Sequence, residues 1–150
     1  MSNIKLKNIF KTVCIASDHA GFDLKEDIKN YLINKKVSIF DLGPYSDHSV
    51  DYPDYAKKLS MRIKSKKSDA GILVCGSGTG MAISANKIRT IRAAVCYNLK
   101  STRLSRQHNN ANIIALGSRL TKKKLSLKLV DIFLKTKFEG GRHLRRVKKI

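Results

Sequence analysis

The chain has 150 residues and a mass of 16.8 kDa, about the size of one domain, and its 42% hydrophobic and 28% charged residues are typical of a globular protein. It has no apolar run of membrane-spanning length, no convincing secretory signal and no CxxC pair among its three cysteines, which argues against a membrane protein, a disulfide scaffold and a zinc finger and predicts a cytoplasmic location. The 31 Lys and Arg residues against 11 Asp and Glu give a net charge of +20, which predicts attraction to nucleic acid, phosphorylated metabolites or anionic lipid without choosing among them.

Short apolar or β-branched runs alternate along the chain with stretches of helical period. The predicted strands are 12–17, 37–41, 70–75, 91–96 and 111–116, and the predicted helices are 20–34, 52–64, 81–87, 99–108 and 121–135. This alternation is typical of an α/β fold with a parallel sheet. We therefore expect residues 1–150 to form a single domain, a three-layer, doubly wound, five-stranded parallel sheet of the Rossmann-like class.

The basic C-terminal segment 139–150 follows the last predicted helix and carries a double glycine after Glu139. It is either a disordered extension or a segment that docks on something anionic. Arg142 and Arg146 are four residues apart, so on a helical turn they share a face and two guanidinium groups can clamp a phosphate. A solvated basic tail is the alternative interpretation.

The ends of the predicted strands are the places to look for a site, because open parallel sheets bind ligands at their carboxyl edge. The segment 75–80, with the sequence CGSGTG, carries the strongest signal: a strand ends at Cys75, three glycines alternate and a helix begins. Such backbone at a helix N-terminus can hold a phosphate, a carboxylate or a developing oxyanion. Its spacing matches neither the GxGxxG dinucleotide pattern nor the P-loop.

Three candidate groups for proton transfer follow from these positions. Cys75 lies where the helix dipole favours a thiolate, although a small buried hydrophobe at a strand end is an equally good interpretation. Asp18 and His19 directly follow the first strand, where Asp18 could instead be only a helix cap. His108 lies at the end of a predicted helix, where the dipole alone would favour a histidine.

Taken together, six segments resemble the B-type ribose-5-phosphate isomerases, a family whose wider membership includes galactose-6-phosphate and allose-6-phosphate isomerases. The resemblance covers about residues 11–147 in unbroken order. The segments are SDHAGFDLK at 17–25, DYPDYA at 51–56, CGSGTGMAISANK at 75–87, RQHNNAN at 106–112, LGSR at 116–119 and EGGRHLRRV at 139–147.

The resemblance implies a reaction without metal or cofactor that interconverts ribose 5-phosphate and ribulose 5-phosphate through an enediolate. It implies that Cys75 is the base and that His108 opens the furanose ring with Asp18 as its proton-handling partner. The oxyanion would be held by the backbone of Gly76, Ser77, Gly78, Thr79 and Gly80, assisted by the Ser77 hydroxyl. The implied phosphate ligands are His19, Arg119, Arg142 and Arg146, and the implied sugar contacts are Asn109 and Tyr52.

The family pattern also implies a homodimer or a dimer of dimers whose active sites lie between subunits, with 139–150 as a docking segment. Some family members use a glutamate shortly after the glycine loop as the base. Here Ser84 and Ala85 are not acidic, which supports Cys75.

Two other functions compete with this interpretation. One is an isomerase of a six-carbon sugar 6-phosphate, because the sequence does not measure the distance between the arginines and Cys75. The other is a nucleic-acid-binding module, for which the +20 charge is the only motive. The chain has no RNA-recognition signature and no Trp, and AT-rich codons would also explain its excess of Lys, Ile and Asn. We therefore expect only weak, salt-sensitive binding to nucleic acid and no membrane partner.

Overall fold

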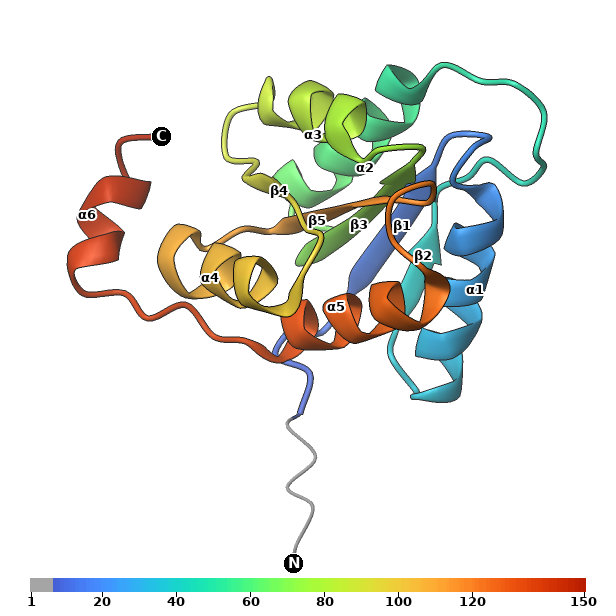
Figure 1. Cartoon of the computed structure of the whole chain (residues 1–150). Coiled ribbons are helices and arrows are strands. Elements are labelled where there is room, and N and C mark those ends of the chain that lie inside the picture. The colour runs from blue at the N-terminus through green and yellow to red at the C-terminus, as the bar shows by residue number, and fades with distance from the viewer. Residues whose placement is uncertain (1–6) are drawn as a thin grey trace, which may run out of the picture.

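The computed structural model describes residues 7–150, in which five parallel strands alternate with helices (Figure 1). The strands are β1 (Val13–Ser17), β2 (Ile39–Asp41), β3 (Ala70–Cys75), β4 (Ala93–Val95) and β5 (Ile113–Gly117). The helices are α1 (Phe22–Asn34), α2 (Tyr52–Lys64), α3 (Thr79–Asn86), α4 (Leu99–Asn109), α5 (Lys123–Lys135) and α6 (Arg142–Val147). The predicted α/β class with a five-stranded parallel sheet is confirmed.

The strand order across the sheet is β2-β1-β3-β5-β4, so β3 lies at the centre. Its neighbours pair with it along most of its length, from Val13 opposite Ala70 on one side to Gly117 opposite Cys75 on the other. The edge strands β2 and β4 are three residues each, shorter than the sequence pattern predicts. Each edge strand has a neighbour on one side only, so fewer of its residues join the hydrogen-bonded ladder.

Helices cover both faces of the sheet and make it the middle of three layers (Figure 1). An apolar cluster of side chains lies on each face. One cluster packs α1 and α5 against alternate residues of the strands, such as Ile72 and Ile114, and α4 lies beside α5. The other packs α2 and α3 against the intervening residues, such as Leu73 and Cys75. Side chains alternate between faces along a strand, so consecutive apolar residues serve both layers.

None of the helices in residues 7–150 combines the length and apolar character that a bilayer span requires.

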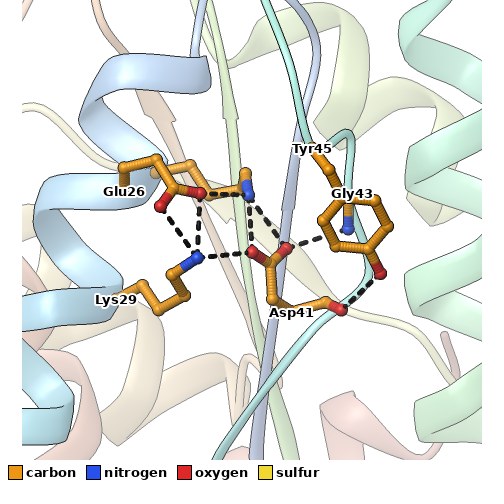
Figure 2. Close-up of polar contacts among 6 residues, drawn as sticks. Glu26, Lys29, Asp41, Gly43 and Tyr45 are labelled. Atoms are coloured by element: carbon orange, nitrogen blue, oxygen red, sulfur yellow. Dashed lines mark hydrogen bonds and ion pairs between the residues drawn. The ribbon is translucent and has the colours of Figure 1, made fainter.

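An ion-pair cluster around a buried lysine joins α1 to the carboxyl end of β2 (Figure 2). Lys25 is fully buried, and its ammonium donates to the two carboxylate oxygens of Asp41 at 2.9 and 2.7 Å and to Glu26 at 2.9 Å. Lys29 donates to the same two acidic residues, each at 2.9 Å. The two lysines and the two acidic residues therefore balance each other's charge around the buried Lys25 ammonium.

The same aspartate also organises the loop that follows β2. A carboxylate oxygen of Asp41 accepts the Gly43 N–H at 2.9 Å, and its carbonyl oxygen accepts the Tyr45 hydroxyl at 3.0 Å (Figure 2). This loop runs on to Val50 and then to α2. The cluster thereby fixes the first residues of a segment whose far end reaches the candidate site described below.

We expect Asp41→Ala to lower the free energy of unfolding by about 3 kcal/mol, because it leaves the buried Lys25 ammonium with Glu26 as its remaining carboxylate. A matched control is Asp27→Ala on the same helix, which removes an exposed ion pair to Lys123 of 3.0 Å. Asp27→Ala should lower the free energy of unfolding by less than about 1 kcal/mol. Urea unfolding of both variants measures the difference, and equal losses would contradict a special role for the buried cluster.

The stability that Asp41 contributes should disappear in acid. Burial alone would raise the pKa of Asp41, but hydrogen bonds from Lys25 and Lys29 outweigh it and hold that pKa below the ordinary value of 3.8. The unfolded chain then binds more protons than the folded chain as the pH falls through 3.8, so stability is lost with falling pH. The gap in unfolding free energy between the unaltered protein and Asp41→Ala should be full at neutral pH and narrow below about pH 4. A gap that stays constant down to pH 3 would contradict this.

Candidate active site

The loop after β3 turns to the opposite face of the sheet from the loops that follow β1 and β5. The chain leaves β3 toward α3 on one face of the sheet, whereas it leaves β1 toward α1 and β5 toward α5 on the other face. In open α/β sheets this reversal opens a crevice at the carboxyl ends of the strands. The segment 75–80 lies in that position, flanked by the loops that follow β1 and β5.

Cys75 ends β3 and has its sulfur at the start of α3. Sγ accepts the backbone N–H of Gly78 at 3.0 Å, and the residue is 4% exposed. Gly78, the N-cap of α3, has a φ of +78°, a left-handed conformation that favours glycine and that turns its N–H back toward the sulfur. The Gly78 N–H and the N-terminus of α3 therefore both face this sulfur. The Cys75 sulfur thus lies beside the backbone of the glycine loop, and its role as the base stays a prediction.

The glycine loop is contacted by an arginine at one end and a tyrosine at the other. A β-carbon added at Gly76 would lie 3.0 Å from the Arg119 guanidinium, and one added at Gly80 would lie 2.8 Å from the Tyr52 ring. Within the loop, Ser77 Oγ accepts the Thr79 N–H at 3.3 Å. The glycines thus let a cation and a phenol ring approach the backbone that surrounds Cys75.

Asp18 and His19 lie beside this loop. The Asp18 N–H donates to the Val74 carbonyl at 3.1 Å, and its carboxylate accepts the Gly21 N–H at 2.9 Å, so the side chain does satisfy the backbone before α1. His19 Nδ1 accepts the Val50 N–H at 3.2 Å. In the neutral imidazole the proton therefore resides on Nε2, which is left as a hydrogen-bond donor.

We call this group the cysteine half-site. It contains Asp18, His19, Tyr52, Cys75, Gly76, Ser77, Gly78, Thr79, Gly80 and Arg119.

The other predicted residues lie near the amino ends of the strands, opposite to the carboxyl ends where Cys75 lies. His108 is in the last turn of α4, and a three-residue connection leads from that helix to the start of β5 at Ile113. Ile113 pairs with Gly71, whereas Cys75 lies four residues further along β3. At about 3.3 Å per residue the two edges are about 13 Å apart along the strands. The structure therefore does not bring His108 to Cys75 or to Asp18 within one chain.

The C-terminal segment is folded and packs against the end of α4. The Glu139 N–H donates to the Gln107 carbonyl at 3.1 Å, and the His143 ring of α6 stacks on His108 with centroids 4.1 Å apart. Figure 1 shows α6 beyond α4, at the left of the molecule. Arg142 and Arg146 lie on one face of α6, as their spacing predicts. We call His108, Asn109, Arg142 and Arg146 the histidine half-site.

A buried arginine that the sequence did not single out supports this second group. Arg106 is 3% exposed and donates to the carbonyls of Thr136 at 3.1 Å and Ala111, while its guanidinium lies over the rings of Phe10 and Phe133. Burial lowers its pKa to about 10, so it remains a cation at neutral pH. It joins the end of α4 to the segment that leads into α6.

Ser118 is a second residue that the sequence pattern did not single out. Its N–H donates to the Cys75 carbonyl at 2.8 Å, and its hydroxyl donates to the Ala20 carbonyl at 2.8 Å. It therefore ties together the three loops of the cysteine half-site. Its place beside Arg119, directly after a strand end, is the signal that could have identified it.

Known proteins are similar to this chain in both sequence and fold. The family model described as ribose/galactose isomerase matches residues 13–150. Ribose-5-phosphate isomerase B of Escherichia coli is 42% identical over 140 residues, which are 93% of this chain and 94% of that protein. A putative sugar phosphate isomerase of Rickettsia conorii is 46% identical over 138 residues, which are 92% of this chain and 96% of that protein.

Solved structures agree with this assignment. A ribose 5-phosphate isomerase of Thermotoga maritima superposes with a TM-score of 0.91 at 54% identity, covering 92% of this chain and 95% of its own. Ribose-5-phosphate isomerase B of Mycoplasma genitalium, solved with bound ribulose-5-phosphate, gives a TM-score of 0.87 at 44% identity, covering 92% of each chain. The cysteine loop, the parallel sheet and these likenesses over nearly the whole length agree, and the chain belongs to the ribose/galactose isomerase family.

Proposed function

We propose that this protein interconverts ribose 5-phosphate and ribulose 5-phosphate, with Cys75 as the base that moves a proton between C2 and C1. The observation that carries the chemistry is the sulfur of Cys75, held at 3.0 Å from a backbone N–H at the start of a helix. The observation that carries the substrate is the family, whose relatives over more than nine-tenths of the chain include ribose-5-phosphate isomerases.

The proton transfer uses the groups around that sulfur. In the open-chain aldose the thiolate of Cys75 takes the proton from C2, the electrons of that C–H bond form the C1–C2 double bond, and the C1 oxygen becomes an oxyanion. Backbone N–H groups of 76–80 stabilise that negative charge. The proton of the C2 hydroxyl then passes to the C1 oxyanion, the thiol returns its proton to C1, and the C2 carbonyl of the ketose forms.

Phosphate binding is the second task, and the positive groups of both half-sites suit it. Arg119 lies against the glycine loop, and His19, whose Nδ1 accepts the Val50 N–H, offers Nε2–H as a donor in the neutral ring. Arg142 and Arg146 present two guanidinium groups on one helix face. A phosphate held away from the reacting carbons supplies binding energy that orients C1 and C2.

In this proposal His108 opens the furanose ring. Within one chain, however, His108 lies at the amino end of the strands, whereas Cys75 lies at their carboxyl end. We therefore propose that two subunits associate so that the histidine half-site of one faces the cysteine half-site of the other. A two-fold axis would then create two equivalent composite sites in a dimer. In this arrangement α6 is a docking segment, Asn109 and Tyr52 contact the sugar, and Asp18 meets His108 across the interface.

The deciding experiment measures ribulose 5-phosphate formation from ribose 5-phosphate by the reduced protein, with and without a chelator. We expect saturable turnover that the chelator leaves unchanged. The same assay with allose 6-phosphate and galactose 6-phosphate should give a lower kcat/KM, because the longer chain misplaces C1 and C2 relative to Cys75. No turnover of the pentose by folded protein would refute this substrate, and a higher kcat/KM for a hexose phosphate would assign the six-carbon reaction instead.

A further inference from the structure

Three potential metal ligands lie together outside the cysteine half-site. They are His108 at the end of α4, Glu139 in the segment before α6 and His143 in α6, and one ligand atom of each lies within 4.8 Å of the other two. The Nε2 atoms of His108 and His143 are 3.9 and 3.6 Å from the same carboxylate oxygen, Oε2 of Glu139. In residues 7–150 this is the one group of three such side chains.

The spacing of these atoms suits a small tetrahedral ion. Three corners no more than 4.8 Å apart enclose a centre that lies about 2.8 Å or less from each, against the roughly 2.0–2.1 Å of zinc bonds to nitrogen and oxygen. A contraction of less than about 1 Å closes that gap. The imidazoles now stack within 12° of parallel, so each ring must tilt to aim its nitrogen at the ion. The side chains are 37%, 49% and 12% exposed, which leaves room for that motion and for a water as fourth ligand.

The donor set and its surroundings select the kind of metal. Two imidazole nitrogens and one carboxylate are ligands for zinc and its neighbours in the first transition row. Magnesium and calcium need several oxygen ligands, and the group offers a single carboxylate with Arg142 and Arg146 on the same short helix. A hard cation therefore gains little here, whereas a borderline one gains two nitrogen bonds.

We propose that His108, Glu139 and His143 form a zinc-binding site that competes with catalysis. Coordination engages the lone pair of His108 and turns its ring away from its stacked position, so the imidazole can no longer exchange protons with the sugar ring. The inhibitory part rests on the proposed function, in which His108 opens the furanose ring. The binding part stands on the geometry of the three side chains alone.

Cobalt is the probe for binding, because a tetrahedral Co²⁺ complex has visible absorption bands that do not depend on enzyme activity. Reduced, chelator-treated protein should develop those bands on titration with CoCl₂ and lose them when ZnCl₂ is added. Glu139→Gln and His143→Gln should each raise the Co²⁺ concentration at half-saturation at least about tenfold, since loss of even an outer-shell partner lowers metal affinity by that factor. His48→Gln, which changes an exposed histidine outside the group, is the matched control and should bind as the unaltered protein does.

Each outcome decides a separate part of the proposal. Absent bands, or bands unchanged in Glu139→Gln and His143→Gln, would overturn the site, and bands lost only in Cys75→Ala would place the ion at the other half-site. With binding established, zinc should lower turnover of ribose 5-phosphate at least tenfold in the unaltered protein and leave both variants active. Binding without inhibition would overturn the inhibitory part. A metal-free protein with no isomerase activity would instead refute the proposed function and leave the Co²⁺ result valid.

Discussion

Replacing Cys75 with alanine is expected to lower kcat for ribose 5-phosphate by at least about 10³-fold, because the proton at C2 then has no base within reach. The side chain is small and 4% exposed, and the groups proposed to hold the phosphate belong to other residues. Substrate binding should therefore change by no more than a few-fold. Exchange of the C2 proton with deuterated solvent, followed by NMR, measures the chemical step, and isothermal titration measures binding.

The other two thiols provide the control for this prediction. Cys14 is fully buried on the same face of the sheet as Cys75, and burial raises its pKa to about 11, so it remains a protonated thiol at neutral pH. Cys96 is also buried, and burial raises its pKa as well. Cys14→Ala and Cys96→Ala should keep turnover within a few-fold. Proton exchange that persists in Cys75→Ala, or that disappears in Cys14→Ala with the fold intact, would show that Cys75 is not the base.

The sequence predicts the sheet well because its central strands carry a strong local signal. The runs that become β3 and β5 are apolar on both faces, so their burial follows from composition. At the edge, the run 91–96 predicts a longer strand than the three residues of β4. There β4 has a single neighbour, β5. The length over which two strands pair depends on both strands together, so the sequence of one strand does not predict it.

Buried charge is the feature that the sequence could not reveal. A lysine in a helix is normally a surface residue, yet Lys25 is fully buried because Asp41, sixteen residues away in sequence, lies against it. Arg106 is buried with its guanidinium over the rings of Phe10 and Phe133. Backbone carbonyls and the Asn110 side chain accept its hydrogen bonds. Both arrangements depend on tertiary neighbours that no local pattern specifies.

The two half-sites also differ in how far local sequence signals predict them. The cysteine half-site was predictable, since strand ends, a glycine loop and a helix start are all local signals that meet at one edge of the sheet. In a parallel sheet each helix runs back toward the amino edge, which places His108, at the end of α4, away from Cys75. The family resemblance adds the expectation that a second subunit completes the site. A single chain shows two partial sites, and it is their separation that makes the assembly testable.

Mixing two inactive variants is expected to restore activity. In a heterodimer of Cys75→Ala and His108→Ala, one composite site carries both changes and the other carries neither. Random assembly of equal amounts gives one half heterodimers with one intact site of two, so activity should return to about a quarter of the unaltered value. The experiment requires co-expression or a dissociation and reassembly step, followed by the ribulose 5-phosphate assay.

The matched control is a mixture in which both changes belong to the same half-site. Cys75→Ala mixed with Arg119→Ala places both changes in the cysteine half-site, so each composite site of their heterodimer carries one of them. Its activity should stay at the mean of the two parent variants. If Cys75→Ala and His108→Ala also fail to complement although the mixed species has formed, the composite site is refuted. His108 would then have to act within its own chain, and α4 and α6 would have to leave the amino edge of the sheet, against the buried contacts of Arg106 that hold them there.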